Sequence, residues 1–234
     1  MTRHFLDPRL TGLVRYVPGE VPRDGRPVIK LNTNENPFPP SPAVVKALSA
    51  AEAERLNLYP DPECTGLTAR IAELCDVAPE EVLVAGGSGA ILNLAFMAFC
   101  DRYHPAAFPE VTCGLYRVLA ELNGVPFKEI PLEEDFTIRA EEYMALGRTL
   151  FIANPNDPTG LAMPIPDLEG IVRRTPDNVV VIDEAYVDFG ATSCLPLIHR
   201  YGNLLVTRTF SKSWSLAGAR LGFCVGNPDL IEDL

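Results

Sequence analysis

Short apolar runs alternate with helix-like stretches through most of this chain, and this alternation constrains its fold more than any other feature. The apolar runs are Val82–Ala85, Ala106–Phe108, Phe127–Ile130, Thr149–Ala153, Val179–Ile182, Leu204–Thr207 and Leu221–Val225. The helix-like stretches between them are Gly89–Cys100, Gly114–Leu122, Ala140–Leu146 and Asp167–Arg173. Strands that alternate with helices predict an α/β fold with a three-layer, doubly wound, mostly parallel sheet. Ligands of such sheets bind at the carboxyl ends of the strands.

The two ends of the chain differ from this alternating part. Residues 1–30 are rich in Pro, Gly and Arg and predict an irregular arm, whereas residues 31–234 predict one large domain. Ser41 and Pro42 suit a helix cap and a first turn, so we expect a helix to about Glu54 and a second over Thr65–Cys75. Residues 227–234 resemble the opening of a helix, and we expect most of a smaller C-terminal domain to be absent.

Charge and composition exclude several classes of function. The formal net charge of −11 argues against nucleic acid or an anionic membrane as the main partner. Six cysteines without a C-x-x-C pair, together with only three histidines, predict neither a metal site nor a disulfide framework. The first ten residues lack the apolar core of a signal peptide, and the apolar stretch near Ala90–Cys100 is too short to span a membrane. We therefore expect a cytoplasmic protein.

Lys212 stands at the end of a predicted strand, in the segment Leu204–Gly222 with the sequence LLVTRTFSKSWSLAGARLG. A lysine that forms a Schiff base must be partly desolvated, so that its amine is neutral and nucleophilic. Ser211 and Arg220 are suited to hold a phosphate, the arginine through paired hydrogen bonds. The alternative is a surface lysine on a polar turn.

Asp183 ends another buried strand, in the segment VVVIDEAY over Val179–Tyr186. A carboxylate at this place can pair with a pyridinium nitrogen and keep it protonated, which makes the ring an electron sink. Tyr186 follows three residues later and could reach a phenolate oxygen of the same ring. The alternative is an acid that binds Mg²⁺ beside a nucleotide, but the sequence has no G-x-x-x-x-G-K-[ST] loop.

Two further loops follow predicted strands and are weaker signals on their own. Asn154–Gly160, NPNDPTG, is rich in turn residues, and a plain tight turn would explain it equally well. Ala85–Ala90, AGGSGA, precedes an apolar helix, where small residues let backbone N–H groups approach an anion.

Taken together, these segments resemble the fold-type I pyridoxal-phosphate (PLP) aminotransferases, and within them the histidinol-phosphate aminotransferase group. The resemblance extends over nearly the whole chain and depends on six motifs in order. These are LNTNENPFPPSP (Leu31–Pro42), YPDP (Tyr59–Pro62), AGGSGA, NPNDPTG, VIDEAY and TFSKSWSLAGARLG. The last motif is similar to the PLP-attachment signature. The resemblance implies that residues 31–234 form the PLP-binding large domain.

The resemblance also implies roles for single residues. Lys212 would hold PLP as a Schiff base and move the proton of the substrate α-carbon. Asp183 would pair with the ring nitrogen, and Tyr186 would donate a hydrogen bond to the phenolate oxygen. The phosphate-binding residues would be Ser211, Arg220 and the backbone of Ser88, Gly89 and Ala90.

Other implied contacts involve the substrate and a second subunit. Tyr59 would reach the phosphate of the neighbouring subunit's cofactor, which implies a homodimer. Asn34, Glu35 and Asn36 would lie near the substrate.

The chain departs from the family pattern at several positions. Asp157 stands where many relatives have Asn, and an anion beside the phenolate oxygen is unfavourable unless it is protonated or turned away. Cys113 stands where an aromatic side chain usually stacks on the ring, and Gly89–Ala90 replaces an acidic pair. The resemblance further implies that the last third of a family member, which supplies an arginine for the substrate carboxylate, would lie beyond these residues.

We therefore expect an aminotransferase that moves an amino group between an amino acid or amine phosphate and 2-oxoglutarate. One alternative is a threonine-phosphate decarboxylase, which shares the cofactor site. Another is a non-catalytic relic that binds PLP without turnover. A nucleotide-binding α/β protein is disfavoured because the phosphate loop with its lysine is absent.

Overall fold

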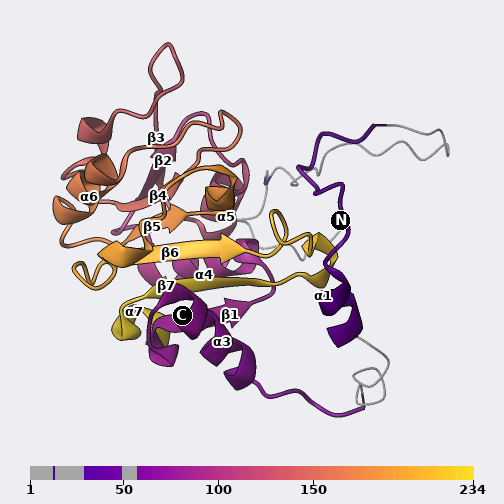
Figure 1. The fold of residues 1–234 in the computed structure, drawn as a ribbon. Coiled ribbons are helices and arrows are strands. Elements are labelled where there is room, and N and C mark those ends of the chain that lie inside the picture. The colour runs from indigo at the N-terminus through magenta and orange to yellow at the C-terminus, as the bar shows by residue number, and fades with distance from the viewer. Residues whose placement is uncertain (1–12, 14–28, 49–56) are drawn as a thin grey trace, which may run out of the picture.

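The computed structural model describes residues 13, 29–48 and 57–234, and its centre is a seven-stranded sheet (Figure 1). The strand order is β1-β7-β6-β5-β4-β2-β3. The strands are β1 Val82–Ala85, β2 Ala106–Pro109, β3 Phe127–Ile130, β4 Thr149–Ala153, β5 Val180–Asp183, β6 Leu204–Thr209 and β7 Gly222–Gly226. Five strands from β6 to β3 run parallel, whereas β7 is antiparallel to both of its neighbours. The predicted fold class is confirmed.

Helices cover both faces of this sheet. The described helices are α1 Pro42–Ala47, which lies apart from the sheet, and α3 Thr65–Cys75, α4 Ser88–Phe99, α5 Leu115–Asn123, α6 Ile165–Arg173 and α7 Pro228–Glu232 (Figure 1). Side chains of α3 and α6 share one hydrophobic cluster with the sheet, and side chains of α4 and α5 share the other. Successive strand residues point to opposite faces, so Val180 and Ile182 join the first cluster and Val181 the second. The sheet is therefore the middle of three layers.

Most predicted strands and helices lie within two residues of their observed bounds, with one clear exception. The helix predicted over Ala140–Leu146 is only a 3-10 turn over Ala140–Tyr143. Ala145 adopts a left-handed φ of 56°, which a continuing right-handed helix cannot contain. This part of the prediction was wrong because the helix-like pattern of these residues does not reveal the left-handed turn at Ala145.

The N-terminal part is described only in pieces. Ser41 caps α1 by accepting a hydrogen bond from the Val44 N–H, as expected. The helix ends at Ala47, with Leu48 as its C-cap, and so is shorter than the predicted helix to about Glu54. Residues 49–56 and nearly all of the predicted arm over 1–30 lie outside the described residues. The division at residue 31 stays a prediction.

Strand β7 brings the loop after β1 close to the end of β6. A Cβ atom on Gly222 would lie 2.5 Å from the Ser88 backbone N and 2.7 Å from the Gly87 carbonyl carbon. Only glycine fits there, because both neighbours are backbone atoms that cannot turn away. This close approach places the start of α4 beside the segment that carries Lys212.

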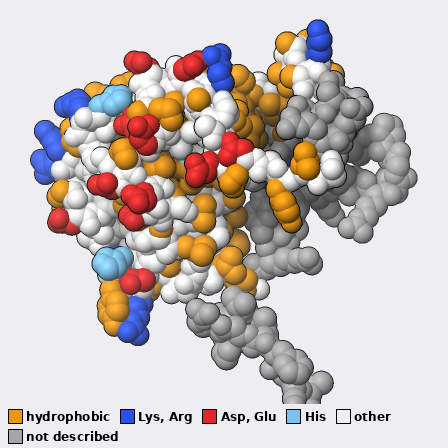
Figure 2. All heavy atoms as spheres, turned by 90° about the horizontal axis from the view of Figure 1, so that it is seen from below, with side chains coloured by type: hydrophobic (Ala, Val, Ile, Leu, Met, Phe, Trp, Pro, Cys, Tyr) orange, Lys and Arg blue, Asp and Glu red, His pale blue; other side chains and the backbone are white. Residues whose placement is uncertain are grey.

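Two properties of the structure bear on the classes of partner, membranes and nucleic acids, that the sequence disfavours. Within the described ranges no helix is long and apolar enough to cross a membrane. Acidic side chains are spread over the face that Figure 2 presents.

Candidate active site

A cavity of about 540 Å³ opens at the carboxyl edge of the parallel strands. Ala153, Asp183 and Thr209, which end β4, β5 and β6, all lie in its wall. The predicted site residues that line it are Glu35, Ser88, Gly89, Cys113, Asp157, Asp183, Tyr186, Ser211, Lys212 and Arg220. The lysine and the acid that were singled out from distant segments thus share one cavity.

Lys212 lies in the cavity wall with its amine held by backbone oxygens. Its Nζ donates to the Thr33 carbonyl oxygen at 3.0 Å and to the Asn34 carbonyl oxygen at 3.3 Å. Burial lowers the pKa of Lys212 below its usual value, although the nearby Asp157 carboxylate works against this shift. A lowered pKa makes the neutral, nucleophilic amine more accessible near neutral pH.

Asp183 is buried at the floor of the cavity and accepts three hydrogen bonds. The Tyr116 hydroxyl donates to Oδ2 at 3.1 Å, while the Thr207 hydroxyl and the Ala185 N–H donate to Oδ1 at 3.2 and 3.1 Å. Burial raises the pKa of Asp183 to about 6, and the three donors limit this rise. At neutral pH the group is therefore predominantly a carboxylate in a buried place.

Tyr116 was missed by the sequence reasoning. It lies on α5 with its side chain fully buried, and its ring packs between Phe108 and Phe151 at centroid distances of 5.9 and 6.0 Å. In the sequence, Tyr116 looks like any other apolar position of an amphipathic helix. The only available signal was that a fully buried tyrosine usually needs a hydrogen-bond partner.

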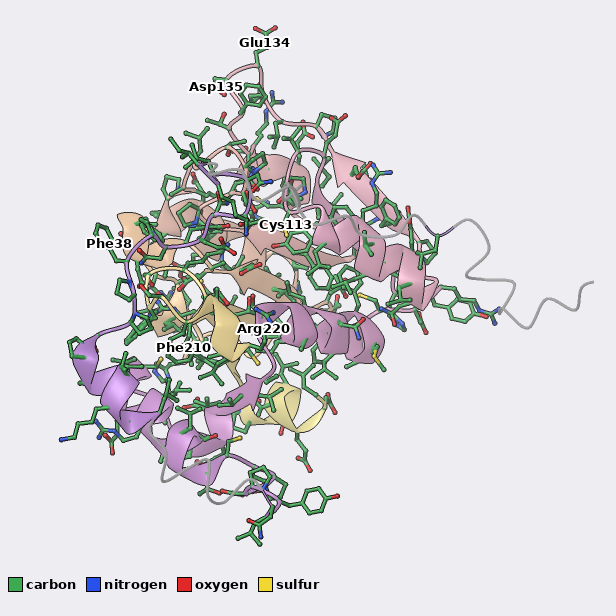
Figure 3. All side chains as sticks on the ribbon, turned by 90° about the vertical axis from the view of Figure 1, so that its right-hand side faces the viewer. Phe38, Cys113, Glu134, Asp135, Phe210 and Arg220 are labelled. Carbon is green, nitrogen blue, oxygen red and sulfur yellow. The ribbon has the colours of Figure 1, made fainter. Side chains whose placement is uncertain are left out.

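One part of the cavity is suited to an anion. Ser88 and Gly89, the first residues of α4, line it. The first N–H groups of a helix have no partner within the helix and favour an anion. Arg220 reaches the same place beside the start of α4 (Figure 3). A Cβ atom on Gly87 would lie 2.8 Å from Arg220 Nη2, so the glycine leaves the space that the guanidinium occupies. Ser211 is held by a hydrogen bond from the Thr209 hydroxyl at 3.0 Å.

Ala90 does not line the cavity. Its N–H donates to the Gly87 carbonyl oxygen at 3.0 Å within the first turn of α4, and the residue is exposed. The predicted backbone contact from Ala90 is therefore not available in this arrangement. Tyr59 does not line the cavity either, and its side chain is fully exposed.

The segment 33–36 passes over Lys212 and Tyr186. Asn34 Nδ2 donates to the Tyr186 hydroxyl at 2.9 Å, and Asn36 Nδ2 donates to the Lys212 carbonyl oxygen at 3.3 Å. Both asparagines line a neighbouring cavity of about 490 Å³ together with Lys212 and Tyr186, and Glu35 faces both cavities. Glu35 also forms an ion pair with Lys30 at 2.8 Å.

Both unusual residues, Cys113 and Asp157, lie in the cavity wall. Cys113 lies two residues before α5, in the wall of the cavity (Figure 3). Burial raises the pKa of its thiol to about 11, so the thiol is neutral at physiological pH. It therefore offers a small apolar surface at the position where the family pattern has a stacking aromatic ring.

Behind Asp183, on the opposite face of the sheet, lies a buried ion pair that the sequence reasoning did not single out. Glu184 Oε2 accepts from Arg208 Nε at 3.0 Å and from Nη2 at 2.8 Å. The other oxygen accepts from the Cys194 N–H at 2.6 Å. This pair joins the ends of β5 and β6, the two strands that carry Asp183 and Thr209.

Metal-ligating side chains do not gather in the described part of the chain. Among these residues no group of three or more His, Cys, Asp and Glu side chains could hold a metal ion. All six cysteines are free thiols.

Comparison with known proteins defines the class. Residues 26–234 match the family "aminotransferase class I and II", and the chain belongs to this family. The histidinol-phosphate aminotransferase of Aromatoleum aromaticum is 48% identical over 227 residues, which cover 95% of this chain and 64% of that protein. The resemblance inferred from the motifs is confirmed. The matches with three curated relatives cover 64–66% of the length of those proteins.

Solved structures agree with this membership. The histidinol-phosphate aminotransferase from Sinorhizobium meliloti, in complex with pyridoxal-5'-phosphate, matches with a TM-score of 0.78 and 25% identity over 85% of this chain and 56% of that one. The L-threonine-O-3-phosphate decarboxylase from Porphyromonas gingivalis matches with a TM-score of 0.73 and 22% identity over 83% of this chain and 61% of that one. The second likeness concerns the fold alone.

Proposed function

We propose that this chain binds pyridoxal phosphate through Lys212 and belongs to an aminotransferase of the histidinol-phosphate aminotransferase type. One observation carries the proposal: the Lys212 amine and the buried Asp183 carboxylate line the same cavity as Ser88, Gly89 and Arg220, which are suited to hold a phosphate. A lysine on a surface turn would not need a cavity shared with a buried carboxylate, and a carboxylate with only a structural role would not need a lysine in the same cavity.

The residues present fit the cofactor. When bound, pyridoxal phosphate supplies an electron-withdrawing ring that stabilises negative charge on the substrate α-carbon. The Asp183 carboxylate would hold a proton on the ring nitrogen, because a buried anion is stabilised by a facing cation. Arg220, Ser211 and the N–H groups at the start of α4 would hold the phosphate. The space left by Gly87 for the Arg220 guanidinium supports this assignment.

Lys212 and Tyr186 would act at the reacting side. Lys212 would bind the cofactor covalently. Once the substrate's amino group takes its place on the cofactor, the freed Lys212 amine would accept the proton from the substrate α-carbon, and burial, which lowers the pKa of this amine, favours its neutral form. Burial raises the pKa of Tyr186 to about 12, so its hydroxyl stays protonated and can donate to the phenolate oxygen. Asn34 orients this hydroxyl through its own hydrogen bond at 2.9 Å.

The complete protein would transfer an amino group between an amino acid or amine phosphate and 2-oxoglutarate. The relative from Aromatoleum aromaticum supports this substrate class at 48% identity. We also propose a homodimer in which the exposed Tyr59 reaches the neighbouring subunit's cofactor. Six free thiols suit a reducing compartment such as the cytoplasm.

Reductive trapping tests the covalent role of Lys212. The purified chain is mixed with pyridoxal phosphate, reduced with borohydride and digested, and the labelled lysine is located by mass spectrometry. We expect the label on Lys212 and its loss in Lys212→Ala. The control Lys128→Ala, which removes an exposed lysine on β3, should keep full labelling. Equal labelling of the Lys212→Ala protein would refute the proposal.

Amino donors then separate the reactions. Histidinol phosphate with 2-oxoglutarate should yield glutamate, whereas release of CO₂ from threonine phosphate would favour the decarboxylase. A protein that carries the label on Lys212 but responds to no donor would favour cofactor binding without turnover.

A further inference from the structure

We propose that Tyr116 is a positioning residue whose hydroxyl keeps the Asp183 carboxylate ionised and aimed into the cavity. This inference rests on the proposed function, because Asp183 acts on a bound cofactor. Tyr116 itself does not line the cavity, so its effect would pass through Asp183.

The hydrogen bonds around Asp183 all favour its anionic form. Tyr116 donates to Oδ2, and the Thr207 hydroxyl and the Ala185 N–H donate to Oδ1. A protonated carboxyl group would itself have to donate from one oxygen, so the hydroxyl that donates to that oxygen would have to turn and accept instead. Of these three hydrogen bonds, only the one from Tyr116 reaches Oδ2. It therefore helps to determine how the plane of the carboxylate is turned.

Tyr116 is held so that its hydroxyl cannot easily move away. Its side chain has no exposed surface, and its ring is wedged between Phe108 and Phe151. Phe151 in turn stacks on Phe96 with ring centroids 3.9 Å apart. Burial raises the pKa of Tyr116 well above its usual value, so the hydroxyl remains a donor over the whole working range of pH.

Other groups near Asp183 set the electrostatic background against which this hydrogen bond acts. The ionisable side chains on the cavity wall are Glu35, Cys113, Asp157, Tyr186, Lys212 and Arg220. Asp157 carries negative charge toward Asp183 and therefore favours its protonation. Loss of the Tyr116 donor should add to this effect and leave Asp183 neutral at higher pH.

The variant Tyr116→Phe removes only the hydroxyl, and Tyr143→Phe is its matched control. Tyr143 is also fully buried, but its hydroxyl has no hydrogen-bond partner among the described residues. The affinity for pyridoxal phosphate is measured between pH 5 and 9, together with the melting temperature of the cofactor-free protein. We expect affinity at pH 7 to fall about tenfold in Tyr116→Phe, as for loss of a hydrogen bond to a charged group.

The pH profile distinguishes positioning from packing. In the unmodified protein, affinity should fall as the pH drops through about 6, where Asp183 takes up a proton. In Tyr116→Phe this midpoint should move to higher pH, while Tyr143→Phe should keep the original midpoint. Thr207→Val, which removes a donor to the other oxygen, should move it in the same direction.

Each other outcome is decisive. An unchanged midpoint in Tyr116→Phe overturns the role of Tyr116 while the proposed function stands. A Tyr116→Phe protein that does not fold would also overturn it, since the hydroxyl would then serve the core. Failure of the unmodified protein to bind pyridoxal phosphate at all would instead overturn the proposed function.

Discussion

Replacing Asp183 by asparagine should stabilise the cofactor-free protein at alkaline pH. The carboxylate is buried, and its pKa is raised from an ordinary value of 3.8 to about 6. An acid whose pKa is raised on folding destabilises the folded state at every pH at which the same group is ionised in the unfolded chain. The cost is fully present above pH 6 and is relieved as the pH falls from 6 toward 4.

The size of the effect follows from the same two values. They correspond to about 3 kcal/mol in the free energy of unfolding at pH 8 and to roughly half of that at pH 5. The amide introduced by Asp183→Asn would keep the hydrogen bonds, because the hydroxyls of Tyr116 and Thr207 can accept as well as donate. For a chain of this size the gain should raise the melting temperature by about 5 to 10 °C at pH 8.

Melting curves of the cofactor-free protein at pH 8 and pH 5 test this reasoning. The gain of Asp183→Asn should shrink by about half at pH 5. The control Asp177→Asn changes an exposed carboxyl group and should shift the melting temperature by no more than about 1 °C. If Asp183→Asn melts no higher than the unmodified protein at pH 8, or if its gain is independent of pH, the buried carboxylate is not a source of instability.

Two further predictions concern the frame around the cavity. Glu184→Gln leaves the Arg208 charge without its buried partner and should lower the free energy of unfolding, measured in urea, by about 3 kcal/mol. The control Glu142→Gln, in an exposed ion pair, should lower it by less than about 1 kcal/mol. Equal losses would refute the importance of the buried pair. Gly222→Ala forces a Cβ atom to within 2.5 Å of a backbone atom and should cost about 3 kcal/mol. Gly226→Ala should cost clearly less, because its Cβ atom would stay 3.1 Å from the Leu205 side chain and 3.3 Å from the Leu204 carbonyl oxygen; similar losses would argue against the close approach at Gly222.

Residues that share a segment were the easiest to assign from sequence. Lys212 and Arg220 belong to one short motif, and Asp183 and Tyr186 to another, so their chemistry could be inferred from local spacing. The structure places all four around one cavity. Ala90 was assigned by the same local reasoning and is absent from the cavity wall, because the first turn of α4 uses its N–H for a hydrogen bond to Gly87.

Residues that act through long-range contacts were not found. Tyr116 and Asp183 are 67 positions apart, and nothing in the helix pattern of α5 distinguishes a tyrosine that contacts an acid from one that only fills the core. Likewise, the contact of Lys212 with the Thr33 carbonyl oxygen joins residues 179 positions apart. Such contacts depend on how whole elements pack against each other.

The sequence by itself determined the fold class and the chemistry of the main residues, because hydrophobic periodicity and short motifs are properties of neighbouring positions. Only the tertiary structure decided that β7 runs against the parallel strands, that Gly222 brings the start of α4 beside the end of β6, and that Tyr116 reaches Asp183. These features arise from close packing between elements far apart in the chain, where one carbon atom or one hydroxyl group decides what fits.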